Sequence, residues 1–400
     1  MLHSAPCTKE MQPFGGPGRF LLGRSEDLLP GLLQTHAGKV QLIYLDPPFA
    51  TGDTFHFQID GMRCSRPAYT DVLQKEEYLR WMRTLLTGCH ALLSPTGAIY
   101  LHIDYRMSAH MRLLLDEIFG ETNFVNEIIW MYKSGGRSTR HFSRKHDTIF
   151  FYRKTKNMYF DIHAVGTPRG AERRNHMKRF IDKDGRVAYS IRSNGKTYVY
   201  HEDMPVYPSD VWMDIEHLHQ RDPERTGYAT QKPEALLRRI VLASSKPGDI
   251  VVDLFSGSGT TAAVCAQTGR EYLVCDSSPY ALYSLRARLN AANAAYSLFD
   301  AHVPMTFTLP ATFSSDINVD FQSSRAGENL SCTLCAYKLP SGQTAPLLYC
   351  SLGHIQGNTY HPLVQTHQVT LPLTLHMPVC DAPALQTMDA DGQMRIWKIE

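Results

Sequence analysis

Apolar positions in this chain fall into two recurring patterns, short branched or aromatic runs and longer stretches with helical spacing. Gln41–Leu45 is a short apolar run that predicts a buried strand. Gln74–Leu93 carries apolar residues three and four positions apart, which predicts an amphipathic helix. The same signals predict a strand and a helix within 20–38, strands at 97–104, 126–132, 147–152, 249–255 and 271–276, and helices at 107–119, 231–245, 261–269 and 279–295. This alternation predicts an α/β fold with a mostly parallel sheet.

Two segments interrupt the alternation. Residues 153–225 contain the turn dipeptides Asp184-Gly185 and Asn194-Gly195 between short alternating runs, which predicts a β-rich insertion. The last hundred residues return to short alternating runs, with a similar turn at Asp391-Gly392, and predict a small β-rich appendage. Residues 53–69 are polar and irregular and predict a loop over the end of the strand before them. The predicted organisation is a tail at 1–19, two halves of the α/β domain at 20–152 and 226–298, the insertion at 153–225 and the appendage at 299–400.

The composition, with 43% hydrophobic and 20% charged residues, is that of an ordinary globular protein. The sequence contains no run of about 18 apolar residues, and its first residues lack the apolar core of a signal peptide. The nine cysteines are scattered and odd in number, which fits reduced thiols better than a disulfide framework. We therefore expect a cytoplasmic protein that does not span a membrane.

Positive charge is concentrated in one segment of a chain whose net charge is only +2. Residues 131–200 hold 17 Lys and Arg against 5 Asp and Glu, which leaves 24 basic and 34 acidic residues elsewhere. Because aromatic residues are interleaved with these bases, the segment predicts contact with a polyanion such as nucleic acid; a solvated hairpin insertion is the alternative. The basic residues that we single out for DNA contact are Lys133, Arg137, Arg140, Arg144, Lys145, Arg173, Arg174, Lys178 and Arg179.

The strand at 41–45 ends on Asp46, which Pro47, Pro48 and Phe49 follow directly. Neither proline has an N–H to donate, so the chain must leave the sheet at its carboxyl edge, where open α/β sheets bind ligands. There an acid oxygen and the Pro47 carbonyl can accept the two protons of an exocyclic amine, while Phe49 stacks on the ring that carries the amine. Such bonds draw the nitrogen lone pair out of conjugation and make it a nucleophile. A simple strand-ending turn is the alternative.

A second informative stretch is Asp253–Thr261, DLFSGSGTT, between a predicted strand and a predicted helix. Gly257 and Gly259 lack a Cβ, so the backbone can approach a ligand at the helix N-terminus. Asp276 ends the next strand, where it can accept hydrogen bonds from ribose hydroxyls. The glycines and Asp276 also satisfy the nicotinamide dinucleotide fingerprint, and a purely structural glycine turn is a further alternative. Against a dinucleotide, the acid at Asp253 would oppose a pyrophosphate but suits a cationic amino-acid group.

Three motifs in a fixed order, DPPF at 46–49, TQKPEALLRRIV at 230–241 and DLFSGSGTT at 253–261, resemble the β-group of DNA amino-methyltransferases of restriction–modification type. Smaller matches are DVW at 210–212 and TGYATQKP at 226–233. The resemblance covers about residues 20–295. It implies a permuted seven-stranded Rossmann-like sheet, S-adenosylmethionine as methyl donor and a target-recognition region where the basic insertion lies. It implies catalytic roles for Asp46, Pro47, Pro48 and Phe49, and cofactor contacts from Asp253, Phe255, Gly257, Gly259, Thr260, Asp276, Thr230, Gln231 and Lys232.

The acid that begins the DPPF motif resembles adenine-directed members of this family more than cytosine-directed ones. The resemblance thus implies a site-specific enzyme that methylates the N6 amine of an adenine swung out of double-stranded DNA. Methylation of cytosine N4 and a catalytically silent DNA-binding subunit are the alternatives. A homodimer and a restriction-subunit partner are also compatible with it. One position departs from the family pattern, because Arg24 stands where an acidic or amide residue often lies near the cofactor's adenine.

Four residues of the appendage, Cys332, Cys335, Cys350 and His354, have a spacing that could hold zinc. Positions three apart in a strand face opposite sides of the sheet, which places the first two cysteines poorly for sharing an ion. We therefore predict no metal site.

Overall fold

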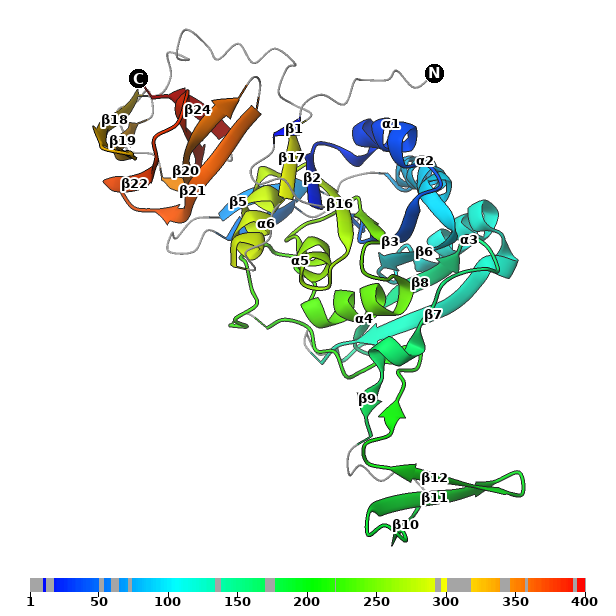
Figure 1. Ribbon diagram of the computed structural model, residues 1–400. Helices are drawn as coiled ribbons and strands as arrows, with labels where there is room; N and C mark the ends of the chain where they lie inside the picture. The colour runs from blue at the N-terminus through cyan, green and yellow to red at the C-terminus, as the bar shows by residue number, and fades with distance from the viewer. Residues whose placement is uncertain are drawn as a thin grey trace.

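The computed structural model describes residues 10–11, 18–49, 54–58, 65–70, 74–133, 138–169, 177–219, 221–291, 296–300, 318–338, 346–356, 359–390 and 394–399. Figure 1 shows three parts: an α/β domain, an arm that projects from it, and a β-rich C-terminal part beside it. Among the described helices none is both long and apolar enough to cross a membrane.

One sheet organises the α/β domain. Its strands are β1 (Glu10–Met11), β2 (Gly18–Leu22), β3 (Val40–Leu45), β6 (Leu93–Ile103), β7 (Phe124–Met131), β8 (His146–Arg153), β14 (Val211–Trp212), β15 (Ile250–Asp253), β16 (Glu271–Asp276) and β17 (Tyr296–Asp300). They lie in the order β1-β17-β2-β16-β15-β3-β6-β8-β7-β14. The seven adjacent strands from β2 to β7 are parallel apart from β8, which runs against both of its neighbours. The predicted permuted seven-stranded sheet is therefore confirmed, and β1, β17 and β14 extend its two edges.

Helices cover both faces of this sheet (Figure 1). They are α1 (Ser25–His36), α2 (Lys75–Leu92), α3 (Ser108–Phe119), α4 (Glu234–Ser244), α5 (Thr260–Gln267) and α6 (Pro279–Ala291), with short 3-10 turns η1 (Glu121–Asn123) and η2 (Ile162–Val165). All six residues of β3 are buried, because Leu42 and Tyr44 pack toward α4, α5 and α6 while Ile43 and Leu45 pack toward α1, α2 and α3. This two-sided burial explains the uninterrupted apolar run in the sequence. The helix predicted at 231–245 is α4, and Pro233 is its N-cap residue.

The region after the DPPF turn differs from prediction. The segment 53–69 was expected to be a loop, but the structure places there the antiparallel strands β4 (Thr54–Gln58) and β5 (Ser65–Thr70). The expectation is wrong because Thr54–Gln58 alternates polar and aromatic residues, a strand pattern that the surrounding polar composition obscured.

The arm is formed by the middle of the basic insertion. Its three-stranded sheet consists of β10 (Lys178–Ile181), β11 (Val187–Ser193) and β12 (Lys196–His201), and the short pair β9 (Thr167–Pro168) and β13 (Pro205–Val206) connects it to the domain. Asn194 and Gly195 form the tight turn between β11 and β12 with φ angles of 48° and 78°, as the Asn-Gly signal predicted. The arm points away from the main sheet (Figure 1), whereas β14, in the same insertion, pairs with β7.

The appendage contains β18 (Asn318–Ala326), β19 (Asn329–Lys338), β20 (Leu347–Gln356), β21 (Thr359–Val369), β22 (Leu373–Pro378), β23 (Pro383–Asp389) and β24 (Met394–Lys398) in two antiparallel sheets. It packs on α6, where the Tyr280 hydroxyl donates to the Ala390 carbonyl at 2.8 Å and the Arg286 guanidinium lies 4.3 Å from the Tyr349 ring centre. Cys332 points into its core while Cys335 is partly exposed. No group of three or more His, Cys, Asp or Glu side chains suited to a metal occurs among the described residues, and the predicted turn at 391–392 lies outside them.

Candidate active site

The two turns singled out in the sequence meet at one edge of the sheet. β3 and β15 are parallel neighbours in the register Leu42 to Val251 and Ile43 to Val252. Their carboxyl ends, which carry Asp46 and Asp253, therefore emerge side by side. β16 follows on the other side of β15 and adds Asp276 to the same edge. The fold brings together the acid–proline turn and the glycine loop although some 200 residues separate them in sequence.

A cavity of about 350 Å³ opens between these strand ends. Nine of the predicted site residues line it: Asp46, Pro48, Thr230, Lys232, Asp253, Phe255, Gly257, Thr260 and Asp276. The other four, Pro47, Phe49, Gly259 and Gln231, are not among the lining residues. The wall also contains residues that sequence analysis did not select, including Tyr44, Trp81, Tyr228, Ser256, Ser258 and Thr261. Arg24, Ser25 and Glu26, at the position that departs from the family pattern, line the cavity as well.

The glycine loop is shaped by its backbone angles. Gly257 has a φ of +51° and Gly259 a φ of +78°, in the left-handed region that favours glycine. A Cβ on Gly257 would lie 3.4 Å from the Tyr228 ring, an ordinary contact. A Cβ on Gly259 would lie only 2.9 Å from Leu285 on α6, so this glycine is required by helix packing. The two glycines of this motif therefore have different roles: Gly257 lines the cavity, and Gly259 allows α6 to pack closely.

Both acids of the cofactor half are held by internal hydrogen bonds. Asp253 accepts from the Phe255 N–H at 2.9 Å and the Thr261 hydroxyl at 2.5 Å, and Asp276 accepts from the N–H groups of Gly257 and Ser278, each at 2.8 Å. Burial raises the pKa of Asp253 to about 7 and that of Asp276 to about 6, since a low-polarity environment disfavours the charged form. A cation bound at Asp253 would compensate for this burial.

Asp46, the acid of the acid–proline turn, has a different hydrogen-bond environment from Asp253 and Asp276. Asp46 Oδ2 accepts from the Lys232 ammonium at 2.5 Å, whereas Oδ1 is buried and has no hydrogen-bond partner among the described residues. Phe49 is partly buried, and its ring lies 5.6 Å from the Lys232 nitrogen and stacks on His102 with ring centres 6.1 Å apart. Asp46 therefore keeps one free acceptor close to an aromatic ring. Lys232, predicted to support a cofactor carboxylate, lines the cavity and pairs with this acid.

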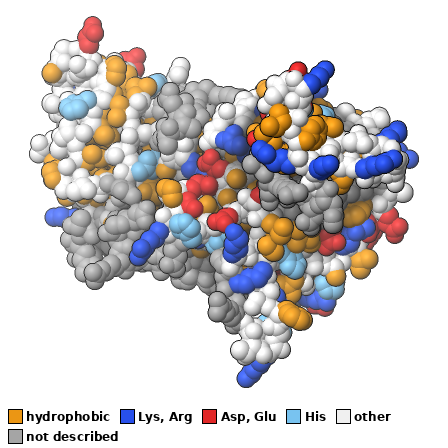
Figure 2. Space-filling view, turned by 90° about the horizontal axis from the view of Figure 1, so that it is seen from below, with side chains coloured by type: hydrophobic (Ala, Val, Ile, Leu, Met, Phe, Trp, Pro, Cys, Tyr) orange, Lys and Arg blue, Asp and Glu red, His pale blue; other side chains and the backbone are white. Residues whose placement is uncertain are grey.

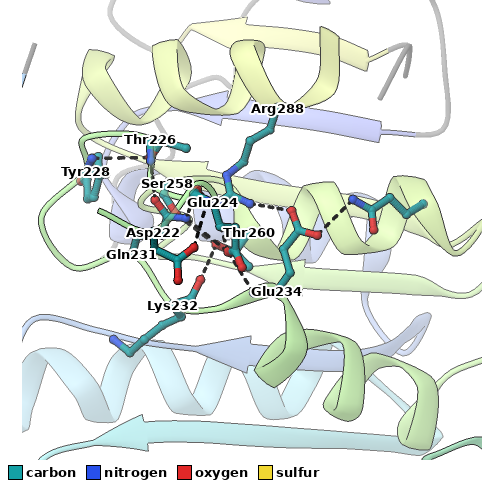
Figure 3. Close-up of polar contacts among 11 residues, drawn as sticks. Asp222, Glu224, Thr226, Tyr228, Gln231, Lys232, Glu234, Ser258, Thr260 and Arg288 are labelled. Carbon is teal, nitrogen blue, oxygen red and sulfur yellow. Dashed lines mark hydrogen bonds and ion pairs between the residues drawn. The ribbon is translucent and has the colours of Figure 1, made fainter. Parts of the chain in front are cut away.

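The segment between Glu224 and Glu234 is clamped to α6, as Figure 3 shows. Gln231 accepts from both the N–H and the hydroxyl of Thr226, at 2.8 and 2.9 Å, and donates to the Glu224 carbonyl at 2.7 Å. Arg288 of α6 pairs with Glu234 at 2.9 Å and with Glu224 at 3.4 Å. Gln231, predicted as a cofactor contact, thus lies where it shapes the loop that carries Thr230.

The predicted DNA contacts divide into two groups. In the first, Lys133 is exposed and pairs with Glu216 at 3.0 Å, Arg140 is exposed, and the Arg144 guanidinium lies 4.2 Å from the Tyr105 ring centre. Lys145 is half-buried, and its carbonyl accepts from the Tyr132 N–H at 2.9 Å. In the second group, Lys178 and Arg179 are exposed on β10 of the arm. Arg137, Arg173 and Arg174 lie outside the described residues.

Basic side chains are spread over the α/β domain and the arm. Figure 2, seen from below, shows Lys and Arg interspersed with exposed hydrophobic groups there and sparser over the C-terminal part at the left. Exposed apolar residues of the arm include Phe180, Ile181, Tyr198 and Val199. Such a mixture of cationic and apolar groups suits a nucleic-acid backbone with bases or sugars beside it.

These features define an α/β domain in which the glycine loop and the acid–proline turn line one cavity at the carboxyl edge of the sheet. The profile of the DNA methylase family N6_N4_Mtase matches residues 40–286. The chain belongs to this family, and it is a DNA methyltransferase that uses S-adenosylmethionine as methyl donor.

Two relatives by sequence agree with this assignment. The chain is 30% identical to the type II methyltransferase M.EcaI of Enterobacter cloacae over 302 residues, which covers 64% of this chain and 66% of M.EcaI. It is 30% identical to the DNA adenine methyltransferase YhdJ of Escherichia coli K12 over 272 residues, which covers 67% of this chain and 82% of YhdJ. A crystal structure of an M1.HpyAVI–SAM complex superposes on 68% of this chain and 98% of its own, with 19% identity and a TM-score of 0.42.

Proposed function

We propose that the chain methylates the N6 amine of adenine at specific sites in double-stranded DNA. The observation that carries this proposal concerns Asp46 Oδ1, which is buried, has no hydrogen-bond partner among the described residues, and belongs to a residue that lines the cavity between the strand ends. A buried acceptor without a partner costs free energy, which a ligand amine would recover by donating to it. The likeness to YhdJ, named a DNA adenine methyltransferase, supports adenine rather than cytosine.

The cofactor side has the groups that S-adenosylmethionine requires. Asp253 offers a carboxylate to a cationic amino-acid group, and Ser256 Oγ is buried, lines the cavity and has no hydrogen-bond partner among the described residues. Gly257 leaves the loop backbone uncovered on that side, and Thr230, Phe255 and Asp276 complete the wall. When bound, the cofactor supplies an electrophilic methyl group.

The residues of the acid–proline turn would orient the base that accepts the methyl group. Asp46 Oδ1 and the Pro47 carbonyl accept the two amine protons, and Phe49 stacks on the base. Lys232, bonded to Oδ2, would keep the carboxylate oriented while the amine is held. Catalysis then consists mainly of positioning two bound reactants in line, and no covalent enzyme intermediate is required. As the new N–C bond forms, the bond between the methyl carbon and the donor sulfur would break, and the surplus amine proton would pass to Asp46 Oδ1 or to solvent.

A base within a duplex cannot reach this edge, so the target must be extruded at a cost of a few kcal/mol. Phosphate contacts from the basic residues offset that cost and make binding depend on salt. We assign these contacts to two places. Lys133, Arg140 and Arg144 lie in the segment between β7 and β8, and Lys178 and Arg179 lie on the arm. A partner of this kind fits the exposed cationic and apolar mixture described above.

The test is incubation with methyl-labelled S-adenosylmethionine and DNA of mixed sequence, followed by mass spectrometry of the nucleosides. N6-methyldeoxyadenosine is expected from the wild-type protein, and none from Asp46→Ala, which should still bind the cofactor. Detection of N4-methyldeoxycytidine in place of this product would show that the target base is cytosine. Unmodified DNA with intact cofactor binding would leave only a DNA-binding role.

A homodimer and a restriction partner stay predictions from the resemblance. One relative, 24% identical over 66% of this chain and 49% of its own length, is named a probable type III Mod subunit of Haemophilus influenzae. Light scattering at micromolar concentration, with and without DNA, measures the oligomeric state directly.

A further inference from the structure

Four polar side chains form a hydrogen-bonded series close to Asp46 and Phe49, at the part of the sheet edge proposed to bind the target base. The Tyr44 hydroxyl lies 2.9 Å from His102 Nδ1, and His102 Nε2 lies 3.2 Å from Asp147 Oδ2. The Tyr132 hydroxyl donates to Asp147 Oδ1 at 3.3 Å. These residues come from the adjacent strands β3, β6 and β8 and from the residue that follows β7. The series therefore runs from the wall of the cofactor cavity, at Tyr44, to the start of the basic loop after β7.

The His102 ring is enclosed on every described side. It is 0% exposed, it meets the Trp130 ring edge-on at 5.6 Å and 89°, and it stacks on Phe49 at 6.1 Å with an interplanar angle of 29°. One face of the imidazole thus supports the ring assigned above to stack on the target base. If this position only filled space in the core, an aliphatic side chain would do so without requiring a buried carboxylate as hydrogen-bond partner.

Both ring nitrogens have fixed partners. Burial raises the pKa of Asp147, but hydrogen bonds and charge from His102, with Lys232 and Tyr132, outweigh it and keep the pKa below its ordinary value. The ionised carboxylate only accepts, so His102 Nε2 donates. Burial keeps the pKa of Tyr44 well above its ordinary value, so its hydroxyl, 2.9 Å from Nδ1, retains its proton. Anchored at both nitrogens, the ring cannot turn about its Cβ–Cγ bond.

We propose that His102 is a positioning residue for the methyl acceptor: clamped between Tyr44 and Asp147, it fixes the plane of Phe49 and thereby the plane of the extruded base. The amine of a base stacked on Phe49 must reach Asp46 Oδ1, only three residues earlier in the chain. A tilt of the supporting ring displaces that amine, and a misplacement of about 1 Å can lower a rate about a hundredfold. This inference rests on the proposed function and adds a residue to it.

The test begins by mapping the methylated position, so that 2-aminopurine can replace the target base in a duplex. His102→Leu removes the ring and both hydrogen bonds. We expect kcat to fall about 10- to 100-fold, the cofactor Kd to stay within about twofold, and the fluorescence anisotropy of the bound probe to drop because the base is no longer held in one plane. Tyr152→Phe is the matched control: it deletes another tyrosine hydroxyl bond, to Asp116 at 2.6 Å, in the same sheet and away from the site.

A second pair of variants keeps the test decisive if His102→Leu does not fold. Asp147→Ala removes the anchor of Nε2 and should lower kcat and anisotropy together, whereas Asp147→Asn keeps an amide oxygen that accepts from Nε2 and should restore both to within about threefold of wild type. Wild-type kcat and anisotropy in all folded variants would overturn the inference, as would a loss of kcat with unchanged anisotropy or a parallel loss of cofactor affinity. A wild-type protein that methylates nothing would instead refute the proposed function.

Discussion

The two halves of the sheet's carboxyl edge are built on opposite plans. Over β15 and β16, both carboxylate oxygens of Asp253 and of Asp276 accept hydrogen bonds from N–H or O–H groups of the protein. Over β3 and β6, one oxygen of Asp46 has no hydrogen-bond partner within the described part of the chain, and the Phe49 ring stacks on His102. The first half is therefore fixed by its own hydrogen bonds before a ligand binds. The second half leaves one hydrogen-bond acceptor available for a donor group of the substrate. Binding and chemistry should therefore fail separately when the halves are changed.

The largest effect is expected at Asp46. Asp46→Asn preserves the shape of the side chain but weakens the acceptor and deprives Lys232 of its ion pair. We expect kcat to fall about 10²- to 10³-fold, the range seen when one stabilising hydrogen-bond group is lost, with the cofactor Kd unchanged. Single-turnover methylation measures the rate and calorimetry measures the Kd. Loss of cofactor binding in this variant would show that the two halves are not separable.

The two loop glycines provide a matched pair for stability. Gly259→Ala places a methyl group 2.9 Å from Leu285 at a positive φ, and we expect the free energy of unfolding to fall by about 2–4 kcal/mol. Gly257→Ala meets only an ordinary contact, so its cost should be about 1 kcal/mol, and its main effect should be weaker cofactor binding. Urea unfolding and calorimetry separate the two. Equal stability losses would contradict the division of roles.

Cofactor affinity should depend on pH through Asp253. Its carboxylate must lose a proton to attract a cation, and its pKa is raised to about 7 by burial. We expect the Kd of S-adenosylmethionine to fall about tenfold between pH 6 and 7.5 and to be nearly flat in Asp253→Asn. Stability without cofactor should change in the opposite sense. The folded state binds this proton more tightly than the unfolded state, so the free energy of unfolding falls as pH rises from about 4 to 7. A Kd independent of pH in the wild type would remove Asp253 from the cofactor site.

The smallest effect concerns the arm. Replacing Lys178 and Arg179 by Ala should weaken DNA binding several-fold and reduce the slope of log K against log salt by about 1 for each phosphate that the arm no longer neutralises. Turnover at saturating DNA should be unchanged, because neither residue lies at the sheet edge. Lys338→Ala, an exposed lysine of the appendage, is the control. An unchanged salt slope would assign the arm to something other than the DNA backbone.

Much of the architecture was readable in the sequence because it depends on local chemistry. The apolar runs of β3 and β16 are buried on both faces, and the Asn-Gly turn of the arm has the positive φ angles that the dipeptide favours. The hairpin of β4 and β5 was missed since its alternation is short and lies in polar surroundings. Of the residues missed in the cavity wall, Ser256 could have been found, because it lies inside the glycine motif itself. Trp81 could not, because only the tertiary structure places its ring 5.5 Å from the Phe255 ring at the cavity wall.

The sequence by itself determined that an acid–proline turn and a glycine loop end two buried strands, because each feature is set by residues within a few positions. Only the tertiary structure decided how the side chains are used. Gln231 clamps its own loop, Gly259 makes room for Leu285, and Lys232 pairs with Asp46, since these partners lie between 5 and 186 positions away in the chain. Contacts over such separations depend on strand order and helix packing, which no local pattern of residues records.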